Sequence, residues 1–373
     1  MPKILQVSTR HNIGGISKLI MELLGDSNFE QVYATGACEK NEKENSLGLT
    51  LPSEGGYKLI RVPRLKRSIR PLGDLQAMCS LIRIIRSEKP DIIHTHMSKA
   101  GLLGRIAALV SMKKIKIVHS YHGHVLEGYF NNLIAKSIVV IEKSLGLFTD
   151  AFIFDGNQTL LEINNYGIRP KKIQQVILPG LIRKTGMRNR SGMQNDMLKI
   201  LVVARIERVK RIDLVLSVAQ NLNRNHPSLK YEIEIVGDGE LRQVYEDQSK
   251  AELLHVKFTG WVDNVDEHYQ NADLLLSVSD SEGTPITFME AASFGCPIIS
   301  TNVGSVADLV DDRKTGILCE KDGEIIAEEI FNLWANQALL FEYSQNSVIK
   351  ATHEFTIEKF INQHSDLYRA LID

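Results

Sequence analysis

The sequence predicts an α/β fold of two doubly wound, parallel-sheet (Rossmann-like) domains facing across a cleft, with a C-terminal helix packing back on the first domain. Three observations lead to this prediction. Short β-branched runs alternate with amphipathic helical stretches, as in βα units on parallel sheets. The 373 residues exceed what one hydrophobic core usually serves. A stretch without hydrophobic periodicity, from Pro179 to Asp196, is typical of an interdomain linker.

The expected strands of the first domain, residues 1–180, are short apolar runs with helical stretches between them. Leu72–Ser87 illustrates these helices, because apolar residues recur there with helical spacing and Lys89-Pro90 ends the pattern before the next strand. The predicted strands are Lys3–Val7, Gln31–Thr35, Leu59–Val62, Ile92–Thr95, Ile117–Tyr121, Ala151–Phe154 and Gln175–Leu178.

The second domain, residues 181–355, repeats this alternation, and the remaining residues read as helix alone. We expect residues 356–373 to form a helix that returns to the first domain. Ligands of such sheets bind beyond the carboxyl ends of the strands, which predicts a site in the cleft. The predicted strands are Ile200–Val203, Glu232–Val236, Lys257–Phe258, Leu274–Val278, Pro297–Ser300 and Gly316–Cys319.

Composition indicates a soluble globular protein, with 24% charged and 43% hydrophobic residues. The four cysteines lie far apart without C-x-x-C spacing, so we expect reduced thiols. No apolar run reaches the roughly 18 residues of a membrane span, and the N-terminus lacks the apolar core of a signal peptide. The sequence therefore predicts a cytoplasmic protein.

Charge is distributed unevenly. Residues 1–180 hold 24 Lys and Arg and 15 Asp and Glu; subtraction from 44 and 45 leaves 20 and 30 in the rest, or about +9 and −10. The overall charge of −1 argues against nucleic-acid binding. A basic first half favours a phosphate-bearing or membrane-surface partner, although ordinary scatter is an alternative. The candidate residues for an anionic membrane surface are Arg64, Lys66, Arg67 and Arg70.

The most informative motif sets two carboxylates, Glu282 and Glu290, eight positions apart across a loop-to-helix junction. Thr284 is expected to be the N-cap and Pro285 the first helical residue, with the helix ending near Gly295. The helix N-terminus suits a phosphate, and Glu290 would lie roughly 9 Å further along the axis. This geometry suits a nucleotide sugar, provided that cations nearby neutralise the diphosphate.

Such cations follow the first strand of the second domain. Arg205 and Lys210 flank one loop, where a guanidinium and an ammonium can together offset a diphosphate and stabilise it as it departs. The alternative is a solvated surface loop.

Glycine-containing turns follow the first predicted strand of the first domain and the second predicted strand of the second domain. Gly14-Gly15 opens the first helix, where backbone must approach a bound group closely, although many such turns use glycine for geometry alone. Gly237 begins a turn that fails the dinucleotide fingerprint, and it is expected to hold a nucleobase edge. Trp261 could contribute to the same pocket or could simply pack.

Five histidines surround the ends of two predicted strands in the first domain. No Asp or Glu accompanies them at a metal-binding spacing, so a metal site is not favoured, and no metal or other cofactor is expected. His122 is instead expected to donate a hydrogen bond to a sugar hydroxyl or a phosphate. The histidines are His94, His96, His119, His122 and His124.

These motifs resemble those of the GT-B glycosyltransferases of family 4, a large retaining family that takes sugars from nucleotide-diphosphate donors. The E-x7-E motif of the family matches Glu282 and Glu290, and the residues on either side also match. Asp91–Gly101 and Tyr121–His124 resemble motifs of its first domain. The resemblance therefore covers nearly the whole chain.

The resemblance implies roles for individual residues, and it implies metal-independent transfer with retention of the anomeric configuration. Arg205 and Lys210 would bind the diphosphate, Glu282 the donor sugar and Glu290 the ribose, while the N–H groups of Thr287 and Phe288 would contact phosphate and His122 would line the sugar site.

We therefore expect a hexosyltransferase that moves a sugar from a nucleotide-sugar donor, UDP-linked by preference, to a saccharide or polyprenyl-linked acceptor in cell-surface polysaccharide synthesis. It would work at the inner face of the cell membrane, with the acceptor bound by the first domain and the donor by the second. Two alternatives stay open. One is a non-hydrolysing UDP-sugar epimerase of the same architecture, and the other is a non-catalytic nucleotide-sugar sensor.

Overall fold

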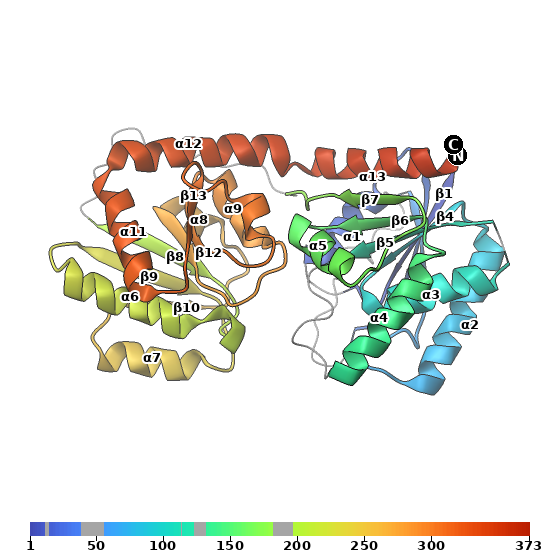
Figure 1. The fold of residues 1–373 in the computed structure, drawn as a ribbon, viewed down its shortest axis with the longest axis horizontal. Helices are drawn as coiled ribbons and strands as arrows, with labels where there is room; N and C mark the ends of the chain where they lie inside the picture. Colours follow the sequence, from blue (N-terminus) through green and yellow to red (C-terminus); the bar gives the residue numbers. More distant parts are fainter. Residues whose placement is uncertain (12–14, 39–55, 113, 123–131, 182–196) are drawn as a thin grey trace. The chain divides into compact units, whose positions relative to one another are not determined.

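The structure is a computed structural model of the 373-residue chain, and it describes all residues except 12–14, 39–55, 113, 123–131 and 182–196 (Figure 1). The chain divides into two compact units. The first unit comprises Met1–Gly180 and Ile357–Asp373, and the second comprises Leu181–Thr356.

The first unit is built on a parallel sheet of seven strands in the order β3-β2-β1-β4-β5-β6-β7. The strand order reverses at β1, so the switch point of the sheet lies between β1 and β4. Each observed strand begins and ends within two residues of its predicted range. The strands are β1 (Lys3–Ser8), β2 (Glu30–Thr35), β3 (Tyr57–Arg61), β4 (Ile92–His96), β5 (Lys116–Tyr121), β6 (Ala151–Phe154) and β7 (Ile173–Val176).

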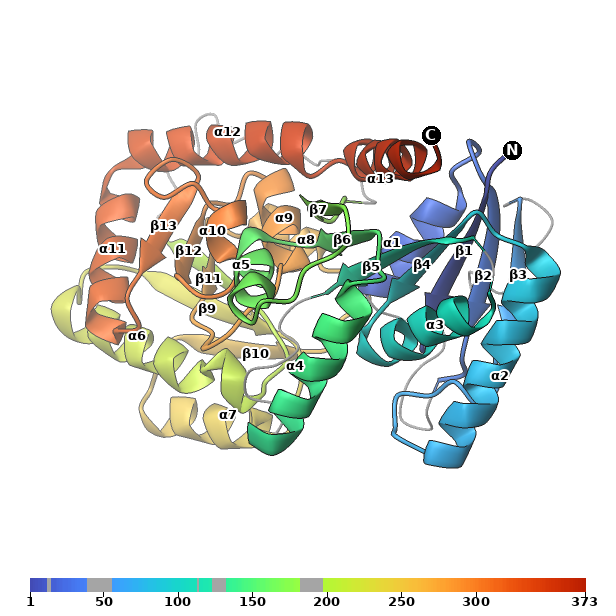
Figure 2. The same ribbon diagram turned by 45° about the vertical axis from the view of Figure 1, so that its right-hand side comes forward.

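Helices cover both faces of this sheet, so its five inner strands are buried along almost their whole length, whereas the edge strands β3 and β7 are not. In Figure 2, α2 and α3 lie on one face, where Leu81 and Ile85 pack against Leu5 and Val7. Helices α1 and α13 lie on the other face, around Ile4. The helices are α1 (Gly15–Leu24), α2 (Pro71–Glu88), α3 (Ser98–Val110), α4 (Asn132–Gly146), α5 (Asn157–Asn165) and α13 (Ile357–Ile372).

The predicted return of the C-terminal helix to the first domain is confirmed. Helix α13 buries Phe360 and Leu371 in the core of the first unit, and the Tyr368 hydroxyl bonds to Gln6 on β1 and His94 on β4. The fold class predicted from the sequence is therefore observed in both units and in this helix.

The second unit repeats the topology, with six parallel strands in the order β10-β9-β8-β11-β12-β13. Its switch point lies between β8 and β11. The strands are β8 (Leu198–Val203), β9 (Tyr231–Val236), β10 (Val256–Gly260), β11 (Leu274–Ser277), β12 (Ile298–Thr301) and β13 (Gly316–Cys319). The helices are η1 (Arg208–Lys210, a 3-10 turn), α6 (Ile212–Asn225), α7 (Arg242–Ala251), α8 (Asp266–Asn271), α9 (Ile286–Ser293), α10 (Val306–Leu309), α11 (Gly323–Ala335) and α12 (Gln337–Glu354).

One detail of the helix that carries Glu290 differs from the prediction. Pro285, and not Thr284, is the N-cap of α9, and the helix begins at Ile286. The reason is the backbone of Pro285, whose φ of −70° suits a helix but whose ψ of 112° is extended. The Pro285 side chain makes no capping hydrogen bond, while Gly295, at φ 66°, ends the helix as expected.

None of the helices in the described part of the chain is long and apolar enough to cross a membrane.

Candidate functional site

Two of the four charged side chains predicted to bind the donor, Lys210 and Glu282, meet at the switch point of the second sheet. Lys210 ends η1, which follows β8, and Glu282 lies in the loop after β11. The Lys210 Nζ lies 2.7 Å from Glu282 Oε1, and Glu282 is buried while Lys210 is 23% exposed. The carboxyl ends of neighbouring parallel strands thus bring together two residues that are 72 positions apart.

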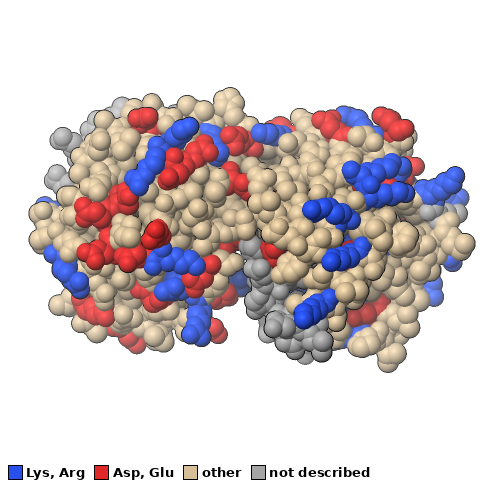
Figure 3. Space-filling view, viewed as in Figure 1, with Lys and Arg blue, Asp and Glu red and all other residues tan. Residues whose placement is uncertain are grey.

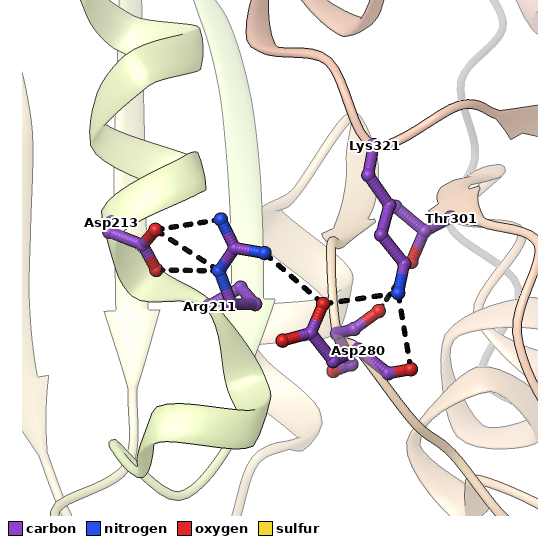
Figure 4. Close-up of polar contacts among 6 residues, drawn as sticks. Arg211, Asp213, Asp280, Thr301 and Lys321 are labelled. Atoms are coloured by element: carbon purple, nitrogen blue, oxygen red, sulfur yellow. Dashed lines mark hydrogen bonds and ion pairs between the residues drawn. The ribbon is translucent and has the colours of Figure 1, made fainter.

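Asp280 connects three loops beside the Lys210–Glu282 pair by hydrogen bonds and ion pairs. Its N–H donates to the carbonyl of Val209 over 2.8 Å, which joins the loop after β11 to η1. Its carboxylate accepts from Arg211 at 3.1 Å and from Lys321, beyond β13, at 3.0 Å. Figure 4 shows Asp280 lying between these two cations, with Asp213 on the far side of Arg211.

The Asp280 network keeps a carboxylate charged beside the site. Burial opposes ionisation of Asp280, but the hydrogen bonds from Lys321 and Arg211 outweigh it and lower its pKa. Arg211 has a φ of 52°, in the left-handed region that non-glycine residues rarely adopt. Such strained residues cluster at functional sites, where the surrounding contacts hold them.

The loop after β12 packs against the backbone of Glu282 and Gly283. Gly304 has a φ of 57°, and a Cβ there would lie 1.7 Å from the carbonyl oxygen of Glu282. The next residue, Ser305, donates its N–H to the carbonyl of Gly283 over 3.3 Å. Only glycine fits at position 304 without displacing the Glu282 backbone.

Helix α9 presents Glu290 and two amide groups. Glu290 Oε2 accepts a hydrogen bond of 3.0 Å from the buried Tyr269 hydroxyl, which orients the carboxylate. Burial and the Glu290 carboxylate raise the pKa of Tyr269 well above 10, so this hydroxyl remains a donor. The N–H of Phe288 donates to the Pro285 carbonyl at 3.1 Å and is therefore already used in this structure. The amide of Thr287 has no partner among the described residues.

The remaining predicted donor-site residues lie at the carboxyl ends of β8, β9 and β10. A Cβ on Gly237 would lie 1.9 Å from the Ala204 carbonyl oxygen, so this glycine allows two strand ends to approach closely. Its N–H donates to Gly260, which precedes Trp261. Trp261 is 68% exposed. Arg205 is also exposed and pairs with Glu207 at 2.9 Å.

His122 belongs to a different cluster, at the switch point of the first sheet. Its Nε2 lies 3.2 Å from His96 Nδ1, and His96 Nε2 bonds to Gln6 at 2.8 Å. Burial, together with the neighbouring His364, lowers the pKa of His122 to about 4, so the ring is neutral near pH 7. Gly15 begins α1. The predictions for Gly14 and His124 lie outside the described residues.

The sequence analysis did not single out four contributors to the site, namely Asp280, Arg211, Lys321 and Tyr269. Asp280 could have been found, because it follows the strand that neighbours β8 and lies two residues before Glu282. Lys321 and Tyr269 belong to no motif. Within the residues that the structure describes, no group of three or more His, Cys, Asp or Glu side chains is arranged to hold a metal ion.

Two doubly wound units, with paired charges at the switch point of the second, are the architecture of the GT-B class. Comparison with known families agrees. A model described as "Glycosyl transferases group 1" matches residues 184–351, and one described as "Glycosyltransferase Family 4" matches residues 19–180. The chain belongs to this family, the group 1 or family 4 glycosyltransferases, and is an enzyme of that kind.

Similar proteins act in surface-polysaccharide synthesis. The Escherichia coli protein named UDP-Gal:alpha-D-GlcNAc-diphosphoundecaprenol alpha-1,3-galactosyltransferase is 28% identical over 325 residues, with 82% of each chain covered. The Escherichia coli O-antigen biosynthesis glycosyltransferase WbnH is 25% identical and covers 80% of this chain and 82% of its own. The fold matches HepE of Anabaena, solved with UDP, at a TM-score of 0.79 and 17% identity over 99% of this chain and 100% of that one.

Proposed function

We propose that this chain is a retaining glycosyltransferase that moves a sugar from a UDP-linked donor to a saccharide or lipid-linked saccharide during cell-surface polysaccharide synthesis. The observation that carries the proposal is the Lys210–Glu282 pair at the switch point of the second sheet. The name of one relative, the Escherichia coli galactosyltransferase, supplies the substrate classes, a UDP-sugar and a diphosphoundecaprenol acceptor. The second unit would bind the donor and the first unit the acceptor.

In this proposal the donor diphosphate lies beside Lys210 and Arg205. Lys210 is held in place before the donor arrives, so its charge needs little reorganisation when the departing diphosphate gains charge. When the donor binds, Glu282 would exchange part of its bond to Lys210 for a hydroxyl of the sugar. The diphosphate therefore replaces one carboxylate as the main partner of the lysine.

The other groups would bind the ends of the nucleotide. Glu290, oriented by Tyr269, would accept hydrogen bonds from the ribose hydroxyls, and the Thr287 amide would donate to a phosphate. The exposed Trp261 and the Gly237 turn would hold the base. The structure leaves Phe288 a smaller role than the sequence predicts, because its N–H already has a partner.

The acceptor side belongs to the first unit, where His122 would contact a sugar hydroxyl as a neutral imidazole. The enzyme would act at the cytoplasmic face of the cell membrane, where a lipid-linked acceptor is accessible. No metal enters this proposal, since Lys210 and Arg205 supply the positive charge.

The test combines binding and product analysis on the purified chain. A nucleotide at a hundredfold excess over its Kd stabilises the fold by roughly 2.7 kcal/mol, so thermal shifts with UDP, GDP and ADP would identify the base. The proposal expects UDP to give the largest shift and expects nucleotide release only when an acceptor is supplied. Conversion of the donor sugar without an acceptor would instead identify an epimerase, and binding without turnover on any acceptor would identify a sensor.

A further inference from the structure

Arg242, the first residue of α7, occupies the position at which a dinucleotide fingerprint would have its last glycine. Its side chain joins two segments of the second unit. Arg242 Nη1 donates to the Asp238 carboxylate at 3.3 Å, in the turn after β9, and Nη2 donates to the carbonyl of Phe258 on β10 at 3.2 Å. One guanidinium therefore links the turn after β9 to the neighbouring strand.

Strand β10 is irregular at the end that Arg242 contacts. Its pairing with β9 shifts register between Phe258 and Gly260, so Thr259 is an extra residue on this strand. Gly260 has a φ of 85°, in the region that favours glycine. Such irregularities bend a strand and re-aim the side chains that follow, and they are frequent beside active sites. The side chain that follows here is the exposed Trp261.

The Arg242 guanidinium packs directly on the backbone of Gly260. A Cβ on Gly260 would lie 2.7 Å from Arg242 Nη1 and 3.4 Å from its Cζ, so the guanidinium takes the space that a side chain would need. The Gly260 carbonyl also accepts from the N–H of Gly237 at 2.8 Å. The end of β10, from which Trp261 emerges, is therefore held both by Arg242 and by the turn after β9.

Ion pairing alone does not account for this arrangement. Basic and acidic side chains are intermingled on the face of the second unit that Figure 3 shows, and Arg242 Nε itself lies 3.6 Å from Glu246, one turn along α7. Exposed pairs of this kind contribute little to stability. Two separate acceptors and a flat contact with glycine instead require the planar, forked guanidinium. The contacts that distinguish Arg242 are those to the end of β10.

We propose that Arg242 is a positioning residue for the nucleobase of the donor, and that it sets the selectivity for the base by fixing the end of β10. This inference rests on the proposed function, in which Trp261 and the Gly237 turn hold the base. A pocket that is fixed in advance loses little entropy on binding and does not adapt to a base of another shape. Arg242 acts through the strand end, so the diphosphate beside Lys210 does not depend on it.

The first test compares three ligands by calorimetry, namely UDP, GDP and inorganic pyrophosphate, which has no base. Arg242→Ala should bind UDP about tenfold more weakly, the effect of losing hydrogen bonds from a charged donor. The ratio of the UDP affinity to the GDP affinity should fall, while pyrophosphate binding stays unchanged. Arg242→Lys should recover only part of the loss, because an ammonium lacks the fork that reaches both acceptors.

Two variants serve as controls for charge and for stability. Glu246→Gln removes the ion pair within α7 and leaves the contacts of Arg242 with β10 in place. Arg313→Ala removes a guanidinium that donates to Glu329 at 2.8 Å, near the amino end of β13 and away from the carboxyl edge of the sheet. Both variants should keep the UDP affinity and the UDP to GDP ratio of the wild type. The melting temperature of each variant shows that it is folded.

A second test observes the end of β10 directly. The chain has two tryptophans, so Trp334→Phe leaves Trp261 as the one tryptophan reporter. In that background, Arg242→Ala should lower the fluorescence anisotropy of Trp261 without any nucleotide, because the segment that carries the indole is no longer fixed. A role of Arg242 confined to the stability of α7 would leave the anisotropy unchanged.

The outcomes separate this proposal from the proposed function. If the wild type binds UDP but Arg242→Ala keeps the same UDP to GDP ratio, the positioning role is overturned and the glycosyltransferase stands. Equal weakening of UDP and pyrophosphate, or unchanged anisotropy of Trp261, would also overturn it. A wild type that binds no nucleotide at all would defeat the proposed function, and the role of Arg242 with it.

Discussion

The switch points of the two sheets have the same topology and opposite chemistry. In the first unit, β1, β4 and β5 carry Gln6, His94, His96 and Ser120, which hydrogen-bond to one another and to Tyr368 of α13. The distances in this network run from 2.6 Å between His94 Nδ1 and the Tyr368 hydroxyl to 3.2 Å between Gln6 and the same hydroxyl. The edge is polar, buried and uncharged.

In the second unit the corresponding edge carries full charges. Lys210 pairs with Glu282, and Asp280 joins Arg211 to Lys321. Except for the buried Glu282, these side chains keep partial exposure, so they retain solvation that a fully buried ion would lose. The charged edge suits an anionic donor, because its partners can be exchanged for phosphates and hydroxyls.

The difference teaches that strand order alone does not decide what a switch point binds. Burial lowers the pKa of His94 and His96 well below 6.5, with the neighbouring imidazoles adding to the effect, so the first edge stays neutral at physiological pH. Helix α13 closes that edge with Tyr368. The second edge has no such cover among the contacts described, and its charges compensate one another.

The largest difference between the two edges is expected in how stability depends on acidic pH. Burial lowers the pKa of His364 on α13 to about 4, against about 6.5 for a free histidine. Between these values the unfolded chain binds a proton that the folded chain does not, so stability is full above about pH 6.5 and falls as the pH drops to 4. The loss from this one residue is about 3 kcal/mol at pH 4.

The measurement is the melting temperature between pH 8 and pH 4. In the His364→Gln variant the melting temperature should fall less as the pH is lowered. His353 is an exposed histidine of α12, and His353→Gln should leave the pH dependence of the melting temperature unchanged. Equal curves for the wild type and the His364 variant would show that the imidazole network does not couple protonation to folding.

Lys210→Ala should remove the stabilisation that the charged edge of the second sheet gives to the departing diphosphate. Removing one preorganised charge stabiliser lowers turnover by about a hundredfold or more. The readout is kcat with the UDP-sugar that the thermal screen identifies, alongside the melting temperature to exclude unfolding. Lys257→Ala is the matched control, since Lys257 also pairs with a glutamate, Glu234, at 2.8 Å but lies away from the site. Similar activity of both variants would remove Lys210 from the mechanism.

The strands could be predicted from the sequence more accurately than the start of helix α9. All strands could be predicted, because each is a short run rich in β-branched or other apolar residues that is bounded by turn residues. The start of α9 was predicted one residue too early, since a proline that suits the first helical turn by φ can still have an extended ψ. Such a detail depends on how the preceding loop enters the helix.

The site was predicted as a set of residues but not as a set of contacts. Glu282 and Lys210 are recognisable from their motifs, whereas their direct pairing follows only from the sheet order that brings β8 beside β11. The links from Asp280 to Arg211 and Lys321 span 69 and 41 positions and leave no local pattern. In the first unit, the histidines could be seen to cluster, but their closure by Tyr368 depends on the returning helix.

Asp280→Asn tests whether the charged edge needs its three loops tied together. The amide keeps the shape but loses the charge that holds Arg211 and Lys321, and we expect about a tenfold loss in kcat/KM, a modest value because the carboxylate is 42% exposed. Asp213→Asn is the control, since Asp213 also pairs with Arg211 but does not touch the loop after β11. Asp280→Glu should restore part of the activity. Equal losses in the Asn variants would indicate that only the charge of Arg211 matters.

Glu282→Gln should have the smallest effect on ligand binding. It should strengthen the binding of UDP, whereas the other variants weaken function. The neutral amide no longer competes for Lys210, so UDP without a sugar should bind about threefold tighter, an effect limited by the partial exposure of the lysine. Transfer should fall, because the carboxylate that accepts from the sugar is lost. Glu207→Gln frees the other predicted cation, Arg205, at a pair whose side chains are 70% and 37% exposed, and it should change UDP affinity little. Weaker UDP binding by the Glu282 variant, measured by calorimetry, would mean that the carboxylate holds Lys210 in its binding position and does not compete with the diphosphate.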